Sequence, residues 1–519
     1  MTILKHGDID QESTGLVLNH SLTPLMKTEY SIKKTASMLH WYSLARELRL
    51  AILGILVRQN HGLAPYATVC KEWQAAIEKK IFCRLKLQPS CLHDFESMVP
   101  RRRCVVKHIW LNIQLRSYSC RSCQDLESCS WTSSNNRIIW RAITKLFSIL
   151  STWDLVGDGL SLELSAQSPS DSEHWFKNSY FRADGEDRND GEGIYGKKAA
   201  CIIHDPKHGW VDGRQLAVPD GYAVLRLFEK IDLRFKEELP EVHAVTKLVL
   251  RRQCRRRFVP RTLWALLDKL PQLKNIVYEP WRVLDRTIQE LHYDTDYKTM
   301  IETHLPKSLK RISLFEDFNE DYVTLVQRTT CLQPDLVRVA QPAVGAALAY
   351  RSLEVEELYV SFMIDAQHFF EARHPSWTWA SLQTLVLTSP LLAPATNHRN
   401  ISGLLQDAGE AALRMPKLQT MALWNGGKRE ACGFLFRKGR NNPTITLRST
   451  WDMNLEHETI KVWRRVASPN GLRIEMRMLR GDIINSHGDA IYHLGLPHGV
   501  IDPVCLRQIR KEGLSRGLP

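Results

Sequence analysis

The chain has 519 residues, of which 44% are hydrophobic and 24% charged. This composition is typical of a folded globular protein and excludes disordered, collagen-like and integral membrane classes. Basic side chains exceed acidic ones, 70 to 57, which gives a net charge of +13. The length predicts several domains or one elongated repeat array. No apolar stretch reaches the ~18 residues that cross a bilayer, and the first residues lack a secretion signal. We therefore expect no membrane partner and a cytoplasmic or nuclear location.

The N-terminal part of the chain changes character near residue 39. Residues 1–38 are polar and aperiodic, so a disordered tail is expected there. Apolar residues then recur at helical spacing, which predicts helices over 43–56 and 66–82 and a small helical module over 39–83. Ser43 is the expected N-cap of the first helix, and Glu47 lies in its first turn, where the helix dipole favours a carboxylate.

The apolar order within this module resembles an F-box. The resemblance implies an adaptor without catalytic activity, which docks on a Skp-type linker protein and thereby joins a cullin ubiquitin ligase. Ala45 stands where that family usually has proline. Helix-in-groove docking needs an apolar row on one helix face, and a tryptophan suits the centre of such a module. The partner-binding residues expected from the resemblance are Leu44, Glu47, Leu48, Ile52, Leu56, Val69 and Trp73.

A short pattern, apolar-x-x-apolar-x-apolar, recurs eight times between residues 82 and 423. Its last two positions alternate as one face of a strand must, and helical spacing at 263–270 and 401–413 separates the strands. The fold class is therefore α/β, and residues 84–425 resemble an irregular leucine-rich-repeat solenoid with long repeats. The strand pairs are Leu85/Leu87, Ile109/Leu111, Leu248/Leu250, Ile276/Tyr278, Ile312/Leu314, Leu358/Val360, Leu385/Leu387 and Met421/Leu423.

Two regions depart from the repeat. Residues 182–198 are rich in Asp, Glu and Gly, which predicts a flexible surface loop. Residues 426–519 predict a C-terminal α/β cap, with strands at 434–436, 444–447 and 472–476 and a helix over 456–466. A cap would shield the last repeat from water.

Longer segments resemble a large filamentous-fungal protein family whose function is unknown. The resemblance covers most of residues 40–510 and implies an intracellular fungal protein, but it implies no activity. The segments that carry it are Trp153 with Leu160–Trp175, Tyr278–Arg282 and Leu314–Glu320.

Two basic clusters, 101–103 and 251–257, concentrate the positive charge. Such runs either contact nucleic-acid phosphates, serve as nuclear targeting patches, or form a solvated rim. Aromatic residues do not alternate with the arginines, as they do in single-strand binders. Nucleic acid is therefore not expected as a partner, and a protein target of unidentified nature is.

Three cysteines, Cys120, Cys123 and Cys129, form a weak candidate metal set. The first two have the Cys-x2-Cys spacing of a zinc knuckle, but no second pair follows at a usual interval. Burial as small apolar side chains is the alternative, so no metal and no cofactor are assigned. His204 and His208 have the spacing of a helical metal pair, although Pro206 between them argues against a helix.

Other local motifs lack the context that chemistry needs, so no catalytic residue is assigned. The Gly-rich string 191–196 follows an acidic stretch that would repel a nucleotide. Residues 170–174 contain Ser, Asp, Glu and His without a nucleophile turn. Glu316, Asp317 and Glu320 are interpreted as surface ion pairs. Two alternatives to an adaptor remain: a repeat scaffold without a ligase role, and a hydrolase or transferase within residues 153–240.

Overall fold

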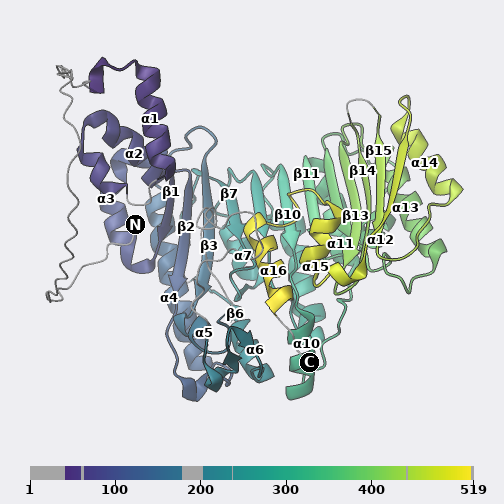
Figure 1. Ribbon diagram of the computed structural model, residues 1–519, viewed down its shortest axis with the longest axis horizontal. Coiled ribbons are helices and arrows are strands. Elements are labelled where there is room, and N and C mark those ends of the chain that lie inside the picture. The colour runs from purple at the N-terminus through teal and green to yellow at the C-terminus, as the bar shows by residue number, and fades with distance from the viewer. Residues whose placement is uncertain (1–40, 60–62, 178–202, 236–237, 440–441, 516–519) are drawn as a thin grey trace, which may run out of the picture. The chain divides into compact units, whose positions relative to one another are not determined.

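The computed structural model describes residues 41–59, 63–177, 203–235, 238–439 and 442–515 (Figure 1). The predicted tail 1–38 and loop 182–198, together with the glycines of 191–196, lie outside these residues. The chain forms two compact units, Met1–Leu85 and Lys86–Pro519. Among the helices of the described residues, none combines the length and apolar character needed to span a bilayer.

The first unit is helical. Its elements are η1 (Trp41–Ser43), α1 (Arg46–Gln59), η2 (Ala64–Thr68) and α2 (Lys71–Cys83). Helix α1 begins at Arg46, so Ser43 lies in the preceding 3-10 turn and the prediction that it caps α1 is wrong. Glu47 lies in the first turn of α1, as predicted.

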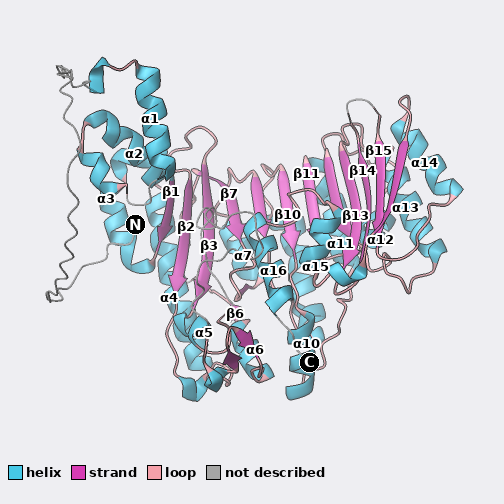
Figure 2. Cartoon of the chain, viewed as in Figure 1, coloured by secondary structure: helices cyan, strands magenta, loops and turns pink. Residues whose placement is uncertain are grey.

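The second unit is built on a twelve-stranded, mostly parallel sheet, whose first strand begins two residues before the unit boundary (Figure 2). Neighbouring strands in the sheet follow one another in the sequence, which is the order that repeated strand–helix–strand connections in one direction produce. Pairing is parallel from β2 to β13, antiparallel on both sides of β14, and parallel again between β15 and β16. The strands are β1 (Arg84–Leu87), β2 (His108–Gln114), β3 (Leu160–Gln167), β7 (Val245–Leu250), β9 (Asn275–Tyr278), β10 (Arg311–Phe315), β11 (Glu357–Ser361), β12 (Thr384–Thr388), β13 (Thr420–Gly426), β14 (Ala431–Arg437), β15 (Thr444–Ser449) and β16 (Arg473–Met478).

Helices connect these strands, so the unit is a mixed α/β fold, as predicted. Neighbouring connections pack on one another, α11 on α12, α12 on α13 and α13 on α14. The main helices are α3 (Leu92–Met98), α4 (Cys129–Leu150), α5 (Pro169–Glu173), α6 (Gly221–Leu227), α7 (Pro260–Leu267), α9 (Thr295–Thr299), α10 (Glu320–Thr329), α11 (Pro342–Arg351), α12 (Ala366–Glu371), α13 (His398–Ala412), α14 (His457–Ala467), α15 (His487–Leu494) and α16 (Pro503–Ser515).

The sheet is covered on two faces in its C-terminal half. All eight predicted residue pairs lie in strands; among them Met421 and Leu423 pair with Phe436 and Phe434, whose rings contact Trp463 of α14. The alternate strand positions point to the opposite face. There they form a core with α15 and α16, which lie in front of the sheet in Figure 1. That core includes Phe315, Tyr359, Val386, Ala422, Trp424, Ala490, Ile491, Cys505 and Ile509.

The C-terminal region continues the same sheet. The strands predicted at 434–436, 444–447 and 472–476 correspond to β14, β15 and β16, and the predicted helix corresponds to α14. The predicted boundary at residue 426 coincides with the end of β13, inside the second compact unit. Strand β3 was not predicted, although its leucines alternate with polar residues.

Candidate functional site

Helix α1 of the first unit presents apolar side chains to solvent. Leu48 is 55% exposed, Ile52 40% and Ile55 47%, and their spacing of four and three residues places them on one helix face. We call these three residues the α1 row. Leu53, on another face of the helix, is 2% exposed and belongs to the core. The row therefore faces outward although its residues are apolar.

The other predicted F-box residues differ in exposure. Val69, just before α2, is 59% exposed, and Glu47 is also exposed, whereas Leu44 and Leu56 are half-buried. Trp73 is half-buried too; its ring lies edge-on to Trp41 at 5.2 Å between centroids. Trp73 therefore packs against Trp41 but is only half-buried, whereas a central position in the module was expected for it.

Polar contacts hold α1 against α2 behind the row. The Glu72 carboxylate accepts a hydrogen bond from the Trp41 indole at 2.9 Å and pairs with Arg49 Nε at 3.1 Å. Arg49 also donates to the Leu44 carbonyl at 3.2 Å. These contacts fix the orientation of α1, so the α1 row is presented by a positioned helix.

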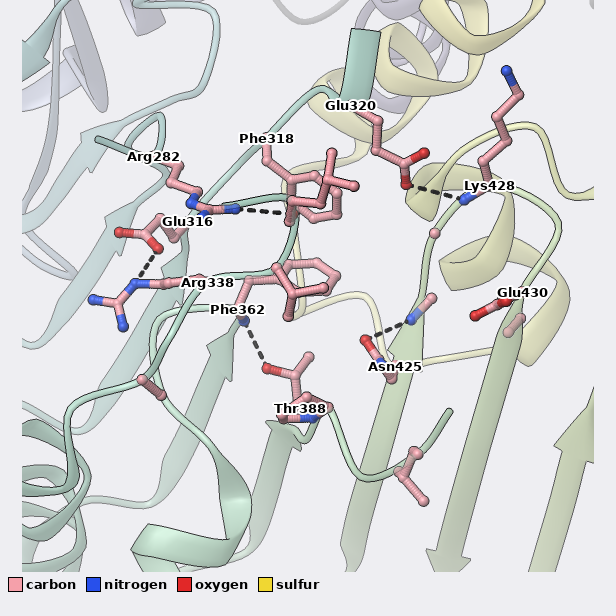
Figure 3. A pocket seen from close by; sticks show the side chains of 18 of the residues that line it. Arg282, Glu316, Phe318, Glu320, Arg338, Phe362, Thr388, Asn425, Lys428 and Glu430 are labelled. Atoms are coloured by element: carbon pink, nitrogen blue, oxygen red, sulfur yellow. Dashed lines mark hydrogen bonds and ion pairs between the residues drawn. The ribbon is translucent and has the colours of Figure 1, made fainter. Parts of the chain in front are cut away.

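A cavity of about 330 Å³ lies in the second unit at the carboxyl ends of β10 to β13, and we call it the carboxyl-edge hollow (Figure 3). Loops that follow parallel strands gather at this edge, which is where α/β sheets bind ligands. Leu336 and Val337, at 56% and 65% exposure, are among the apolar residues that line it. The other lining residues used below are Arg282, Glu316, Phe318, Arg338, Phe362, Thr388 and Asn425.

A charged group forms one wall of the hollow. Glu316 is buried and lies 2.6 Å from Arg338 Nε, and Arg338 also pairs with the buried Asp294. Burial raises the pKa of Asp294 to about 6, against the opposing effect of Arg338. Arg282 donates a hydrogen bond to the Leu336 carbonyl at 3.0 Å, and burial lowers the pKa of the Arg282 guanidinium. The wall therefore offers fixed charges of both signs.

Two aromatic rings form the floor of the hollow. Phe318 and Phe362 meet edge-to-face at 4.9 Å, and in Figure 3 they lie between the Glu316–Arg338 pair and Asn425. Phe362 has a φ of +63°, which costs a non-glycine residue of order 1 kcal/mol or more. Its backbone N–H donates to Thr388 Oγ1 at 2.7 Å. The strained conformation aims the ring at the hollow.

Four arginines of the cluster, Arg251, Arg252, Arg255 and Arg256, are buried in the second unit, and Arg257 is half-buried. The surface interpretations of this cluster, including a nucleic-acid surface and a solvated rim, are therefore wrong. Arg252 is 1% exposed and pairs with Asp317 and with Glu512, at 2.9 Å from Arg252 Nη2. Arg255 pairs with the same Glu512, and Arg256 with Glu127. Buried arginines need such partners because desolvation of an unpaired charge is costly. Arg252 and Arg255 thus anchor α16 to the segment that follows β7.

The carboxylates predicted as surface ion pairs are also buried. Glu316 is 3% exposed and Asp317 is fully buried. Asp317 accepts from His487 Nε2 at 2.8 Å in addition to its pairing with Arg252. Only Glu320, half-buried at the start of α10, lies near the surface, where it accepts from the Lys428 backbone at 3.2 Å. The prediction of a surface location is therefore wrong for Glu316 and Asp317.

Of the three candidate cysteines, Cys120 alone belongs to a group of described side chains that could hold a metal ion. Cys129 is exposed at the first residue of α4, and Cys123 is buried in an apolar cluster. Cys120 instead lies with His174 and His208, two histidines that the cysteine spacing did not indicate. His204 is not part of that group; it is exposed and pairs with Asp212 at 3.3 Å.

The comparisons with known proteins name no activity. Residues 304–502 match a family of unknown function (DUF6546), a stretch that contains β10 to β16 and most residues of the carboxyl-edge hollow. No curated protein matches the chain.

Proposed function

We propose that this protein is a substrate-recognition adaptor of a cullin-type ubiquitin ligase in the cytoplasm or nucleus. In this proposal the first unit is an F-box that docks on a Skp-type linker, and the second unit binds a protein target. The adaptor itself has no catalytic role, because proximity to the ubiquitin-loaded enzyme supplies the rate effect.

The observation that carries the proposal is the exposure of the α1 row. Leu48, Ile52 and Ile55 stay accessible on a helix that the Arg49–Glu72 pair joins to α2. Exposed apolar residues at i, i+4 and i+7 are the anchors of a helix that enters a partner's groove. A row turned inward would have favoured the alternative, a repeat scaffold with no ligase role.

The second unit supports the role of target binder. Its strands follow chain order in one sheet, as in an irregular leucine-rich-repeat solenoid, which we propose as its architecture. The sheet face that such repeats use for binding is covered here by α15 and α16. We therefore assign the target to the carboxyl-edge hollow, where Leu336 and Val337 form an exposed apolar rim beside the charged wall.

The test is binding of the purified full chain to a recombinant Skp-type linker protein, measured by calorimetry. Leu48→Asp places a charge in the α1 row, and we expect it to weaken binding by at least about tenfold, as for a central interface anchor. The matched control is Leu291→Asp, because Leu291 is a 65% exposed leucine of the second unit. No binding by the folded wild type would reject the adaptor role and favour the scaffold, whereas equal affinities of the wild type and Leu48→Asp would place the docking surface outside the α1 row.

A further inference from the structure

We propose that Cys120, His174 and His208 bind a zinc ion. Zinc in proteins takes thiolate sulfur and imidazole nitrogen ligands in tetrahedral geometry. The three donor atoms lie within 4.8 Å of one another, although the residues come from segments up to 88 positions apart in the chain. This site is independent of the α1 row and of the carboxyl-edge hollow.

The distances suit a shared ion. Cys120 Sγ lies 3.5 Å from His174 Nδ1 and 3.1 Å from His208 Nε2. Bond lengths of about 2.3 Å to sulfur and 2.0 Å to nitrogen, at the tetrahedral angle, place such atoms roughly 3.5 Å apart. Small side-chain shifts are enough to bring all three donors to one centre.

The outer nitrogens of both histidines are held by acceptors. His208 Nδ1 lies 2.7 Å from Asp205 Oδ2, and His174 Nε2 lies 3.3 Å from the Tyr118 carbonyl. A metal-bound histidine usually donates its other N–H to a carboxylate or a carbonyl, which fixes the ring and the tautomer. Both rings therefore present a bare nitrogen toward the Cys120 thiol.

Backbone contacts hold the segments that carry the three ligands. Asp205 and Trp210 exchange backbone hydrogen bonds at 2.7 and 3.0 Å, which closes the turn that holds His208. His174 follows α5, whose start has a capping box at Ser168. Cys120 opens the short 3-10 helix η5 (Cys120–Ser122). These pieces have little regular structure of their own, so an ion that joins them would stabilise the fold directly.

A metal-free thiol–imidazole pair is the competing interpretation. Cys120, His208 and Asp205 alone have the order of a nucleophile, a base and an orienting carboxylate. That arrangement does not explain His174. The Nδ1 of His174 also faces the thiol, and its Nε2 lies at hydrogen-bond distance from the Tyr118 carbonyl. A zinc ion accounts for both rings, which is why we favour it.

The experiment measures zinc in the purified full chain by mass spectrometry, after dialysis against metal-free buffer. We expect about one zinc per chain in the wild type and less than about 0.2 in Cys120→Ser and His208→Asn, since loss of one of three ligands removes most of the affinity. Cys129→Ser is the matched control, because this cysteine lies close in sequence but outside the group, and it should keep its zinc.

A second measurement covers variants that fail to fold. The wild-type chain, stripped with a chelator, is titrated with Co²⁺; a thiolate-to-cobalt charge-transfer band with visible d–d bands of tetrahedral intensity is expected. A folded wild type with neither zinc nor a cobalt spectrum would overturn the proposal, as would full zinc retention in Cys120→Ser. Rapid alkylation of Cys120 in such a metal-free protein would identify the thiol–imidazole pair instead.

Discussion

At the scale of single residues, the buried carboxyl of Glu279 makes stability depend on pH. It accepts hydrogen bonds from the backbone N–H groups of Asp502 at 2.7 Å and Arg252 at 3.2 Å. Burial, and next the charge of Asp502, raise its pKa from 4.5 to about 7. Between these values the folded state keeps a proton that the unfolded state releases, so stability falls as pH rises through the window.

We therefore expect wild type to lose stability relative to Glu279→Gln as pH rises from 4.5 to 7, by up to about 3 kcal/mol. Above about pH 8 the difference should be constant, because the carboxyl is then ionised in both states. Thermal unfolding of both proteins at half-unit pH steps measures this. A difference that stays flat from pH 4.5 to 8 would contradict the raised pKa.

Alanine substitutions at two glycines near the proposed zinc site distinguish the free-energy cost of a left-handed backbone from the cost of a steric clash. Gly209 and Gly213 have φ values of +74° and +79°. A Cβ on Gly209 would lie 2.1 Å from the Ala217 carbonyl oxygen, whereas one on Gly213 meets nothing within 4 Å. Gly213→Ala thus carries only the left-handed penalty of about 1–2 kcal/mol.

Gly209→Ala carries the same penalty and a backbone clash, so we expect it to be the more destabilising variant by chemical denaturation. It should also lower the zinc content, because His208 directly precedes it, while Gly213→Ala keeps its zinc. Equal effects of the two substitutions on stability would show that the turn relaxes freely around Ala217.

At the scale of secondary-structure elements, α16 is held by charge as well as by apolar contact. Its Glu512 is 5% exposed and pairs with Arg252 and Arg255. Removal of one partner from a buried ion pair costs roughly 3–5 kcal/mol, because the remaining charge stays desolvated. The exposed Glu458–Lys461 pair of α14, at 3.5 Å, is a surface counterpart.

We expect Glu512→Ala to destabilise the protein by roughly 3 kcal/mol or more, and Glu458→Ala by less than about 1 kcal/mol. Hydrogen exchange followed by mass spectrometry should locate the loss of protection in α16. Similar melting temperatures for the two variants would mean that Glu512 does not hold the helix.

The strands were predictable because their signal is local. Pairs such as Leu358/Val360 and Leu385/Leu387 are separated by one residue, and every such pair lies in a strand. The layers on both faces of the sheet also have a local signal. Met421–Trp424 is apolar at successive positions, which is typical of a strand that is buried on both faces.

The polar sites were not predictable from local patterns. Arg252 looked like a surface residue because its partner Glu512 lies 260 positions later. Cys120 was grouped with Cys123 and Cys129 by spacing, while its neighbours in space are His174 and His208, 54 and 88 positions away. One sequence contains no record of such contacts; only the fold brings them together.

At the scale of the whole molecule, the chain divides at Leu85 into two compact units. Each proposed site lies within one of these units. The α1 row belongs to the first unit. The carboxyl-edge hollow and the residues of the proposed zinc site belong to the second. Removal of residues 1–83 leaves β1 (Arg84–Leu87) intact, so the fragment 84–519 retains every strand of the large sheet.

We expect this fragment to unfold cooperatively, within a few degrees of the corresponding transition of the full chain, because its core is its own. It should retain zinc and lose all affinity for the Skp-type linker. Differential scanning calorimetry, zinc analysis and linker titration on the same preparation check the three outcomes.

A fragment that binds the linker as tightly as the full chain would place the docking surface outside the α1 row. A fragment that unfolds without a cooperative transition would show that the first unit is part of the sheet's core. A fragment that keeps its unfolding transition but contains no zinc would show that Cys120, His174 and His208, which it retains, are not the metal ligands.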